Sequence, residues 1–263
     1  MKKLISLALA LVMLVGSCFA LSACTAPEDE LIIGITYFRP MNYKDDNGKL
    51  VGFETEFAEA VCAELGMKPK FQEIDWEAKV SELNGKTIDC IWNGMTIDDD
   101  RRAAMAISTP YMKNKQVLVV KTEKLSEFTA ETDLTGKTLV AEKGSAGETA
   151  AKTEDYLKCA TYTGVTSQTT ALMEVKSGTA DACVIDYVTA LGSIGEDTDF
   201  TDLSIVTALT FGEEEQYGIA FRKGDTELVD KVNAAIATLA ENGKLEEIAK
   251  KYKLEDYLLV GKK

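Results

Sequence analysis

The feature that most constrains the fold is a pattern that occurs twice in the chain. The stretches "VSELNGKTIDCIWN" and "MEVKSGTADACVID" each contain a helix end, a glycine, a short polar link, an aspartate and a buried strand. Asp89 and Asp181 occupy the matching positions. Helices that alternate with strands in this way imply parallel sheets. Because the second series restarts the same plan, we expect two α/β lobes rather than one long sheet.

The expected elements follow from the spacing of apolar residues. "LIIGIT" at 31–36 has the composition of a buried strand, and apolar residues recur every four positions from Phe53 to Leu65, which predicts a helix that Gly66 ends. The remaining expected elements are strands at 70–75 and 87–94, a helix at 76–85, a strand, glycine-rich turn and helix within 136–157, and helices within 226–252.

Composition and charge exclude several classes of function. The chain of 263 residues has a formal net charge of −14 and no Lys/Arg-rich run, so we expect no nucleic-acid partner. Histidine is absent, which removes the usual catalytic triads and the commonest metal ligand. The run "DDDRR" lacks the alternating oxygens and glycine turn of a Ca²⁺ site. We therefore expect no metal and no cofactor.

The first residues predict the cellular compartment. Two lysines, an apolar run and the box "LSAC" ending at Cys24 are typical of a lipoprotein signal peptide at 1–23, with Cys24 as the lipid-bearing residue and 24–30 as a tether. This predicts an exported lipoprotein, anchored to the outer face of the cell membrane or held in the periplasm. An uncleaved membrane anchor is the alternative, and a second box ending at Cys18 is weaker because apolar residues follow it.

Four further cysteines are Cys62, Cys90, Cys159 and Cys183. Their even number permits disulfides in an exported chain, yet Cys90 and Cys183 lie in apolar runs and no pair has CxxC spacing. We expect buried free thiols.

A candidate ligand site follows the strand at 87–94. In parallel sheets, ligands lie beyond the carboxyl ends of strands, where the turn "NGMTIDDDRR" begins at Asn93. Gly94 allows a ligand near the backbone, Thr96 offers a hydroxyl, and a helix after Ile97 places the aspartates in its first turn. The planar fork of Arg101 suits a carboxylate; its alternative role is an ion pair with those aspartates.

The second series offers a complementary pair of groups. The turn "EKGSAGETA" opens a helix, so its N–H groups and Ser145 can bind an anion. Asp186 ends the strand "DACVID" and suits an ammonium group, or alternatively caps the next helix. A grip on a carboxylate from one lobe and on an ammonium group from the other describes an α-amino acid.

At this point a resemblance supports the same interpretation. The blocks "LVGFETEFAEAVCAELGMKPKFQEIDWEAKVSELNGKTIDCIWNGMTIDDDRR", "STPYMKNKQVLVVK" and "EEQYGIAFRKGDTELVDKVNAAIATLAENGKLEEIAKKY" resemble the polar amino-acid substrate-binding proteins of ABC importers. The resemblance runs from Leu31 to Tyr252 and implies an α/β fold of the two-lobed periplasmic-binding-protein type II, with a ligand cleft between lobes joined by two crossovers. The implied boundaries are 31–111 plus 217–256 for lobe 1, 116–211 for lobe 2, and 112–115 and 212–216 for the crossovers.

The resemblance also implies roles for individual residues. Arg101 corresponds to the family's α-carboxylate ligand, helped by Thr96 and the backbone at Gly94 and Ser145. Asp186 corresponds to its α-ammonium partner.

Phe38 and Trp76 stand where the family sandwiches the ligand between aromatic rings; the alternative for Trp76 is an ordinary core position. The first loop, "GITYFRPMNY", is shorter than the family pattern and lacks its early aspartate. Glu142 occupies a position that faces the ligand side chain. It favours a cationic side chain, bonds an amide, or points to solvent.

We therefore expect a monomeric solute-binding protein, not an enzyme, that captures a free L-amino acid and delivers it to the membrane subunits of an ABC importer. One alternative is an enzyme on the same fold, of the dehydratase kind, for which Lys143 and Ser145 are the only nucleophile and base to propose. The other is a ligand-sensing module for a separate membrane receptor.

Overall fold

The computed structural model describes residues 29–131, 133–196, 198–209 and 211–261. The expected signal peptide, the lipid-bearing Cys24 and all but the last two residues of the expected tether lie outside the described residues. Within those ranges, none of the helices combines the length and apolar character needed to span a bilayer.

Lobe 1 is built around a mixed sheet of five strands in the order β4-β1-β5-β13-β6. Its strands are β1 (Glu30–Ile35), β4 (Lys68–Glu73), β5 (Cys90–Ile91), β6 (Met105–Ile107) and β13 (Ala220–Arg222). β1 is parallel to β4 and β5, whereas β13 is antiparallel to β5 and β6. The parallel arrangement expected for β1, β4 and β5 is thus confirmed, and the sheet is mixed because β13 runs in the opposite direction to the other four strands.

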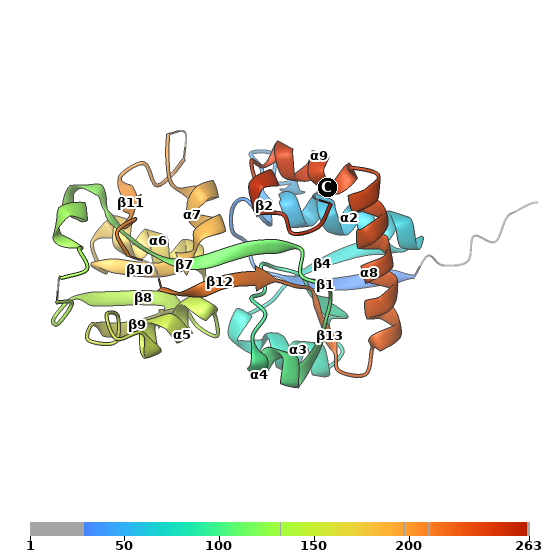
Figure 1. Cartoon of the computed structure of the whole chain (residues 1–263), viewed down its shortest axis with the longest axis horizontal. Helices are drawn as coiled ribbons and strands as arrows, with labels where there is room; N and C mark the ends of the chain where they lie inside the picture. The colour runs from blue at the N-terminus through green and yellow to red at the C-terminus, as the bar shows by residue number, and fades with distance from the viewer. Residues whose placement is uncertain (1–28, 132, 197, 210, 262–263) are drawn as a thin grey trace, which may run out of the picture.

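Helices cover this sheet. They are α2 (Phe53–Leu65), η1 (Trp76–Ala78), α3 (Lys79–Asn84), α4 (Asp99–Ala104), α8 (Thr226–Glu241), α9 (Lys244–Lys251) and η3 (Glu255–Tyr257), with a small hairpin of β2 (Tyr43–Lys44) and β3 (Leu50–Val51). α2 packs against α8 and α9 (Figure 1). Gly66 ends α2 with a φ of 67°, as expected. The single helix expected at 76–85 is instead a 3₁₀ turn followed by α3.

Lobe 2 is built around a second mixed sheet in the order β11-β7-β10-β8-β9, with β12 also pairing with β7. Its strands are β7 (Met112–Lys121), β8 (Thr138–Glu142), β9 (Thr161–Val165), β10 (Ala182–Asp186), β11 (Leu203–Ile205) and β12 (Phe211–Tyr217). Its helices are η2 (Thr122–Glu127), α5 (Ala146–Thr153), α6 (Gln168–Ser177) and α7 (Tyr187–Ser193). The two-lobed α/β architecture expected from the sequence is confirmed.

The repeated aspartates play the same structural part in both lobes. The Oδ2 atom of Asp89 accepts the backbone N–H of Ile32 at 3.0 Å, and the Oδ2 atom of Asp181 accepts that of Thr138 at 2.9 Å. Each aspartate therefore ties the start of its own strand to the neighbouring strand, β1 or β8. The repeat in the sequence is a repeat in the structure.

Two strands run between the lobes. β7 and β12 pair antiparallel, with Met112 opposite Tyr217, and extend from one group of elements to the other (Figure 1). The crossovers expected at 112–115 and 212–216 fall within these two strands. The lobe boundaries themselves stay a prediction.

All four cysteines in the described residues are free thiols. Cys62, Cys90 and Cys183 are buried as expected, but Cys159 is exposed. It follows α5 in a short turn, where no apolar pattern holds it inside, so the expectation of burial was wrong for this residue.

Candidate functional site

A small cavity lies where the two lobes meet. It is lined by every residue that the sequence singled out for the site, together with two that it missed: Phe38, Trp76, Asn93, Gly94, Thr96, Arg101, Glu142, Ser145 and Asp186, with Ala146 and Gln168. Its volume is about 10 Å³, room for about one water molecule. A ligand as large as an amino acid can enter it only when the lobes separate.

The lobes touch directly around this cavity. Side chains of lobe 1 donate to the carbonyl oxygen of Gly144 in lobe 2, and the Thr169 hydroxyl of lobe 2 donates to the carbonyl oxygen of Tyr37 at 3.3 Å. Gly192 approaches Pro40 so closely that a Cβ atom would lie 2.5 Å from the proline ring. The structure therefore has the two lobes closed on each other.

Two larger hollows, of about 410 and 560 Å³, open at the edges of the lobe boundary. The first shares Thr96 and Ala146 with the small cavity, and the second shares Phe38. Neither contains Arg101 or Asp186. Of these three spaces, the small cavity is the one lined by both Arg101 and Asp186.

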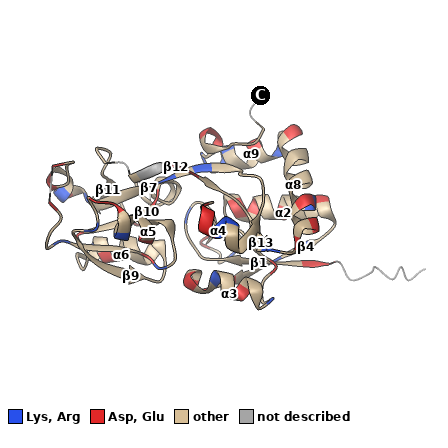
Figure 2. Cartoon of the chain, turned by 60° about the horizontal axis from the view of Figure 1, so that its bottom comes forward, with Lys and Arg blue, Asp and Glu red and all other residues tan. Residues whose placement is uncertain are grey.

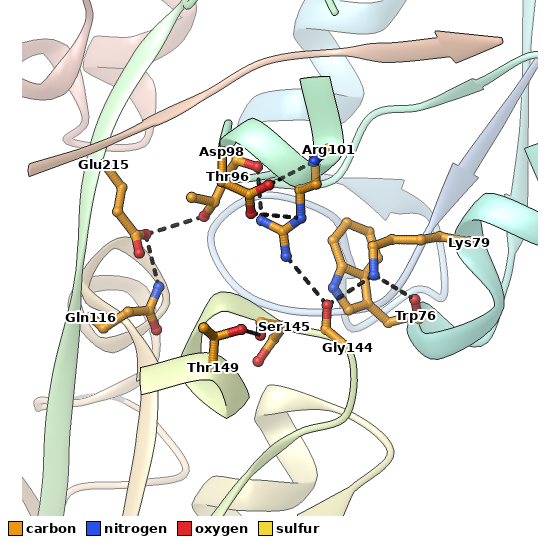
Figure 3. A network of polar contacts seen from close by, with 10 residues as sticks. All are labelled: Trp76, Lys79, Thr96, Asp98, Arg101, Gln116, Gly144, Ser145, Thr149 and Glu215. Carbon is orange, nitrogen blue, oxygen red and sulfur yellow. Dashed lines mark hydrogen bonds and ion pairs between the residues drawn. The ribbon is translucent and has the colours of Figure 1, made fainter. Parts of the chain in front are cut away.

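Arg101 reaches this cavity from α4. The helix begins as expected, because the Asp98 carboxylate caps it by accepting the backbone N–H of Arg101 at 2.7 Å. The Arg101 guanidinium donates from Nη1 to Thr96 O at 2.7 Å and from Nη2 to Gly144 O at 3.3 Å (Figure 3). Its Nε lies 3.3 Å from Asp98 Oδ2, so the ion pair weighed as an alternative also exists. α4 thus presents acidic and basic residues side by side (Figure 2).

Asp186 faces the cavity from the end of β10 and is 6% exposed. Its Oδ1 atom accepts from the Asn114 and Gln116 amides, both at 2.7 Å, and its Oδ2 atom accepts from Gln168. Burial raises the pKa of Asp186. The side chain makes no capping hydrogen bond to α7, so the alternative role as a helix cap is wrong.

The same two amides join a second carboxylate. Asn114 donates to Glu215 Oε2 at 3.0 Å. Gln116 and the Thr96 hydroxyl donate to the same oxygen at 2.9 and 3.1 Å (Figure 3). Burial raises the pKa of Glu215. Glu215 thus connects Thr96 in lobe 1 with the Asp186 network through the strands that cross between lobes.

Glu54 supports the turn at Asn93 and Gly94 from below. Its carboxylate accepts the Gly94 N–H with both oxygens, at 2.8 and 3.0 Å, and the Tyr111 hydroxyl donates to it. Burial raises the pKa of Glu54 to about 7. Because Glu54 already holds the N–H of Gly94, the backbone donor expected there for a ligand carboxylate is committed. The Asn93 side chain donates to Thr36 O and Asn42 Oδ1, which fixes the same turn.

Glu142 is buried beside the cavity at 3% exposure, so the alternative in which it points to solvent is wrong. Its Oε1 atom has no hydrogen-bond partner. Burial, with the nearby Asp186 carboxylate, raises the pKa of Glu142 to about 8, against the opposing effect of Lys79. An unpartnered buried oxygen is costly, so this position is suited to a hydrogen-bond donor.

The two aromatic residues have mixed surroundings. Trp76 lines the cavity and also belongs to the core of lobe 1 with Ile74 and Leu83, so both interpretations of this residue hold in part. Phe38 likewise lines the cavity and packs in the core, 3.1 Å from the position a Cβ of Gly94 would take.

Ser145 caps α5: its hydroxyl accepts the backbone N–H of Glu148 at 3.0 Å. Lys143 is exposed and packs over Gly164. The proposed nucleophile and base therefore show no hydrogen bond to each other. Across the described residues, His, Cys, Asp and Glu form no group of three or more suited to holding a metal ion.

Besides Asn114, Gln116 and Glu215 of the Asp186 network, sequence reasoning missed four further residues at or beside the site. Gln168 and Ala146 line the cavity as first residues of α6 and α5, and Glu54 and Lys79 lie behind it. Gln168 and Ala146 carried a usable signal, because each follows a serine that caps a helix. Nothing in the local pattern separates Glu54 and Lys79 from ordinary charged helix residues.

Comparisons with known proteins agree on one family and one fold. The sequence model of the bacterial extracellular solute-binding proteins, family 3, matches residues 31–255. The L-cystine-binding protein TcyJ of Escherichia coli K12 is 31% identical over 84% of this chain and 82% of its own length. The L-arginine-binding protein of Pseudomonas aeruginosa is 33% identical over 86% of this chain and 89% of its own.

A solved structure has the same fold. An ABC uptake transporter substrate-binding protein from Streptococcus pneumoniae with bound histidine superposes with a TM-score of 0.77, at 36% identity, over 88% of this chain and 94% of that one. The two-lobed periplasmic-binding-protein type II fold is therefore confirmed. These similar proteins are named as binding proteins and not as enzymes.

Proposed function

Since this chain belongs to the bacterial extracellular solute-binding proteins, family 3, we propose that it captures a polar L-amino acid between its lobes and delivers it to an ABC importer. It does so as a monomeric binding protein and carries out no chemical conversion. Relatives named for arginine and cystine, and a similar structure with bound histidine, support the ligand class.

The observation that carries the proposal is the meeting of Arg101 and Asp186 at one cavity from opposite lobes. A guanidinium on one side and a carboxylate on the other match the two charges of an α-amino acid. Arg101 takes the α-carboxylate with Ser145, and Asp186 takes the α-ammonium group. The Thr96 hydroxyl joins Arg101 by giving up its hydrogen bond to Glu215. Phe38 and Trp76 enclose the carbon skeleton between them.

Glu142 sets the requirement on the ligand side chain. Its buried, unpartnered oxygen needs a donor, which guanidinium, imidazolium and amide groups supply and a carboxylate or an aliphatic chain does not. We propose that the ligand is an amino acid with a nitrogen donor at the end of its side chain, with L-arginine as the first candidate.

Binding proceeds by movement of the lobes about β7 and β12. A ligand enters the open protein, and closure then removes the charged groups from water. Inside the closed protein their hydrogen bonds are stronger than in water. The closed form then docks on the importer. A role as a sensor for a separate receptor differs only in the partner, so loss of amino-acid uptake on deletion of the protein favours transport.

The first test is a thermal-shift screen of the purified protein, refolded from denaturant to remove any co-purified ligand, against the twenty amino acids and cystine. Binding raises the stability by about 2.7 kcal/mol at a hundredfold excess over Kd. We expect L-arginine, L-histidine or an amide to raise the melting temperature, and acidic or aliphatic amino acids to leave it unchanged. No shift with any amino acid refutes the proposal.

We further propose that Cys24 carries a lipid that holds the exported protein at the outer face of the membrane. Replacement of Cys24 by alanine is expected to move the protein from the membrane fraction to the soluble exported fraction or to block processing. Retention of the variant in the membrane with the wild-type size contradicts the lipid anchor.

A further inference from the structure

Lys79 is a buried cation beside the candidate site that has no role in the ligand contacts described above. It is the first residue of α3 in lobe 1 and is 6% exposed. Its ammonium group lies 4.8 Å from the centre of the Trp76 ring, whose side chain lines the cavity. Burying an ammonium group costs free energy unless the group is hydrogen-bonded, so its hydrogen-bond partners indicate its role.

The Lys79 ammonium has one partner in each lobe. It donates to the carbonyl oxygen of Trp76 at 3.1 Å within lobe 1, and to that of Gly144 at 2.8 Å in lobe 2 (Figure 3). Gly144 belongs to the turn between β8 and α5. The shorter of the two hydrogen bonds therefore crosses the boundary that must open to admit a ligand.

The acceptor turn is shaped for this approach. Gly144 has a φ of 71°, and a Cβ atom there would lie 3.1 Å from both Glu77 Cα and Lys79 Nζ. Its N–H donates to Glu148 Oε2 at 2.7 Å, which fixes the turn within lobe 2. The Gly144 carbonyl is thus held in place and presented to lobe 1 without a side chain in between.

Arg101 shares this acceptor, through Nη2 at 3.3 Å. A carbonyl oxygen has two lone pairs and accepts both donors. When a ligand carboxylate takes up the Arg101 guanidinium, the hydrogen bond from Lys79 remains. Lys79 therefore contributes to the contact between lobes without binding the ligand, whereas Arg101 serves both the Gly144 carbonyl and the ligand carboxylate.

We propose that Lys79 is a positioning residue that holds the two lobes closed through the carbonyl oxygen of Gly144. The effect of Lys79 on ligand retention rests on the proposed function, whereas its effect on closure of the ligand-free protein does not. The hydrogen bond favours the closed arrangement before a ligand arrives and slows the separation of the lobes afterwards. Lys79 thereby affects ligand dissociation more than association.

Hydrogen exchange of the purified, ligand-free full chain, read by mass spectrometry, tests the closure. We expect Lys79→Met to speed exchange at least threefold in the segments on both sides of the bond, 76–84 and 143–149, and to leave the strands of both sheets unchanged. Lys79→Arg, whose guanidinium can reach the same carbonyl, is expected to show an intermediate rate. Lys86→Met removes the same charge from an exposed position just beyond α3 and is expected to match the wild type.

Ligand dissociation, followed by stopped-flow tryptophan fluorescence with the ligand found in the screen, gives the second readout. We expect at least fivefold faster dissociation from Lys79→Met, with association within twofold of the wild type. Wild-type exchange in Lys79→Met overturns the inference, and so does faster exchange in one lobe only. If the wild type binds no amino acid, the proposed function fails, and the exchange rates alone decide the role of Lys79.

Discussion

The Nη1 atom of Arg101 lies 2.7 Å from the carbonyl oxygen of Thr96, five residues earlier in the chain, to which it donates a hydrogen bond. With the ion pair to Asp98, this bond fixes the guanidinium before a ligand is present. Of its five N–H groups, one on each terminal nitrogen remains uncommitted. The site is therefore preorganised for a carboxylate, which reduces the cost of ordering on binding.

Replacing Arg101 by alanine is expected to weaken binding of the amino acid by about 2–5 kcal/mol, that is about 30-fold or more, because the ligand carboxylate loses its charged partner in a buried site. Titration calorimetry with wild type and variant measures the difference. Arg102→Ala is the matched control, since Arg102 is the exposed neighbour on the same short helix. Equal loss in both variants contradicts the assignment.

The affinity for L-arginine is expected to depend on pH through Glu142, which has a pKa raised to about 8 mainly by burial. The ionised carboxylate pairs with the guanidinium, so affinity rises from pH 6 to 7.5 as Glu142 loses its proton. Lys79, whose pKa burial lowers to about 8, stays mostly charged over this range. Calorimetry at several pH values checks the slope.

In Glu142→Gln the rise with pH is expected to disappear, and arginine to bind about tenfold more weakly at pH 7.5, the equivalent of about 1.4 kcal/mol. The affinity for L-glutamine, whose side chain is uncharged, is expected to fall less in this variant than the affinity for arginine. A slope that survives in this variant shows that another group titrates on binding.

The stability of the ligand-free protein is expected to fall as pH rises. Burial raises the pKa of Glu54 to about 7 and of Glu142 to about 8, from 4.5 in both cases. Each folded-state pKa lies above the unfolded one. The contribution of each carboxyl group to the free energy of unfolding is therefore complete below about pH 4.5 and is lost as the pH rises through 7 to 8.

Denaturant unfolding at pH 5 and pH 8 measures this loss. Glu142→Gln is expected to reduce the difference between the two pH values by at least about 1.4 kcal/mol, the equivalent of one pKa unit. An unchanged difference means that Glu142 titrates normally in the folded protein.

Gly144→Ala is expected to reduce both stability and affinity. A positive φ at a residue other than glycine costs about 1 kcal/mol, and the added Cβ also meets Glu77 and Lys79 across the lobe boundary. Gly136→Ala is the matched control, because Gly136 has a φ of 84° with nothing within 4 Å of the added Cβ. We expect thermal unfolding to show similar losses of stability in the two variants. Calorimetry is expected to show an affinity reduced about tenfold in Gly144→Ala alone.

Much of the site could be predicted because its residues follow strands. Asn93 to Arg101 come after β5, Glu142 ends β8 with Ser145 in the turn that follows, and Asp186 ends β10, so the topology alone brings them to one edge. The repeated sequence pattern around Asp89 and Asp181 predicted the two-lobed plan, and each aspartate makes the same hydrogen bond between neighbouring strands in its own lobe.

The remaining features depend on contacts between distant segments. Glu54 is fixed by Gly94 and Tyr111, which lie forty and more residues away, so its burial is invisible in the helical pattern around it. Lys79 acquires its partner in lobe 2, the Gly144 carbonyl, from a turn 65 residues away. The antiparallel β13 could not be placed either, because a three-residue strand carries no signal for its neighbours.

The position of β13 also determines the order in which the two lobes can fold. This strand lies between β5 and β6 in the sheet of lobe 1, yet it follows them in the chain by more than a hundred residues. The sheet of lobe 2, by contrast, is drawn from one continuous stretch, β7 to β12. An exported chain emerges with its N-terminus first. Lobe 2 can therefore fold before β13, the strand that pairs with both β5 and β6, has emerged. The lobe that begins the chain is the last to be finished.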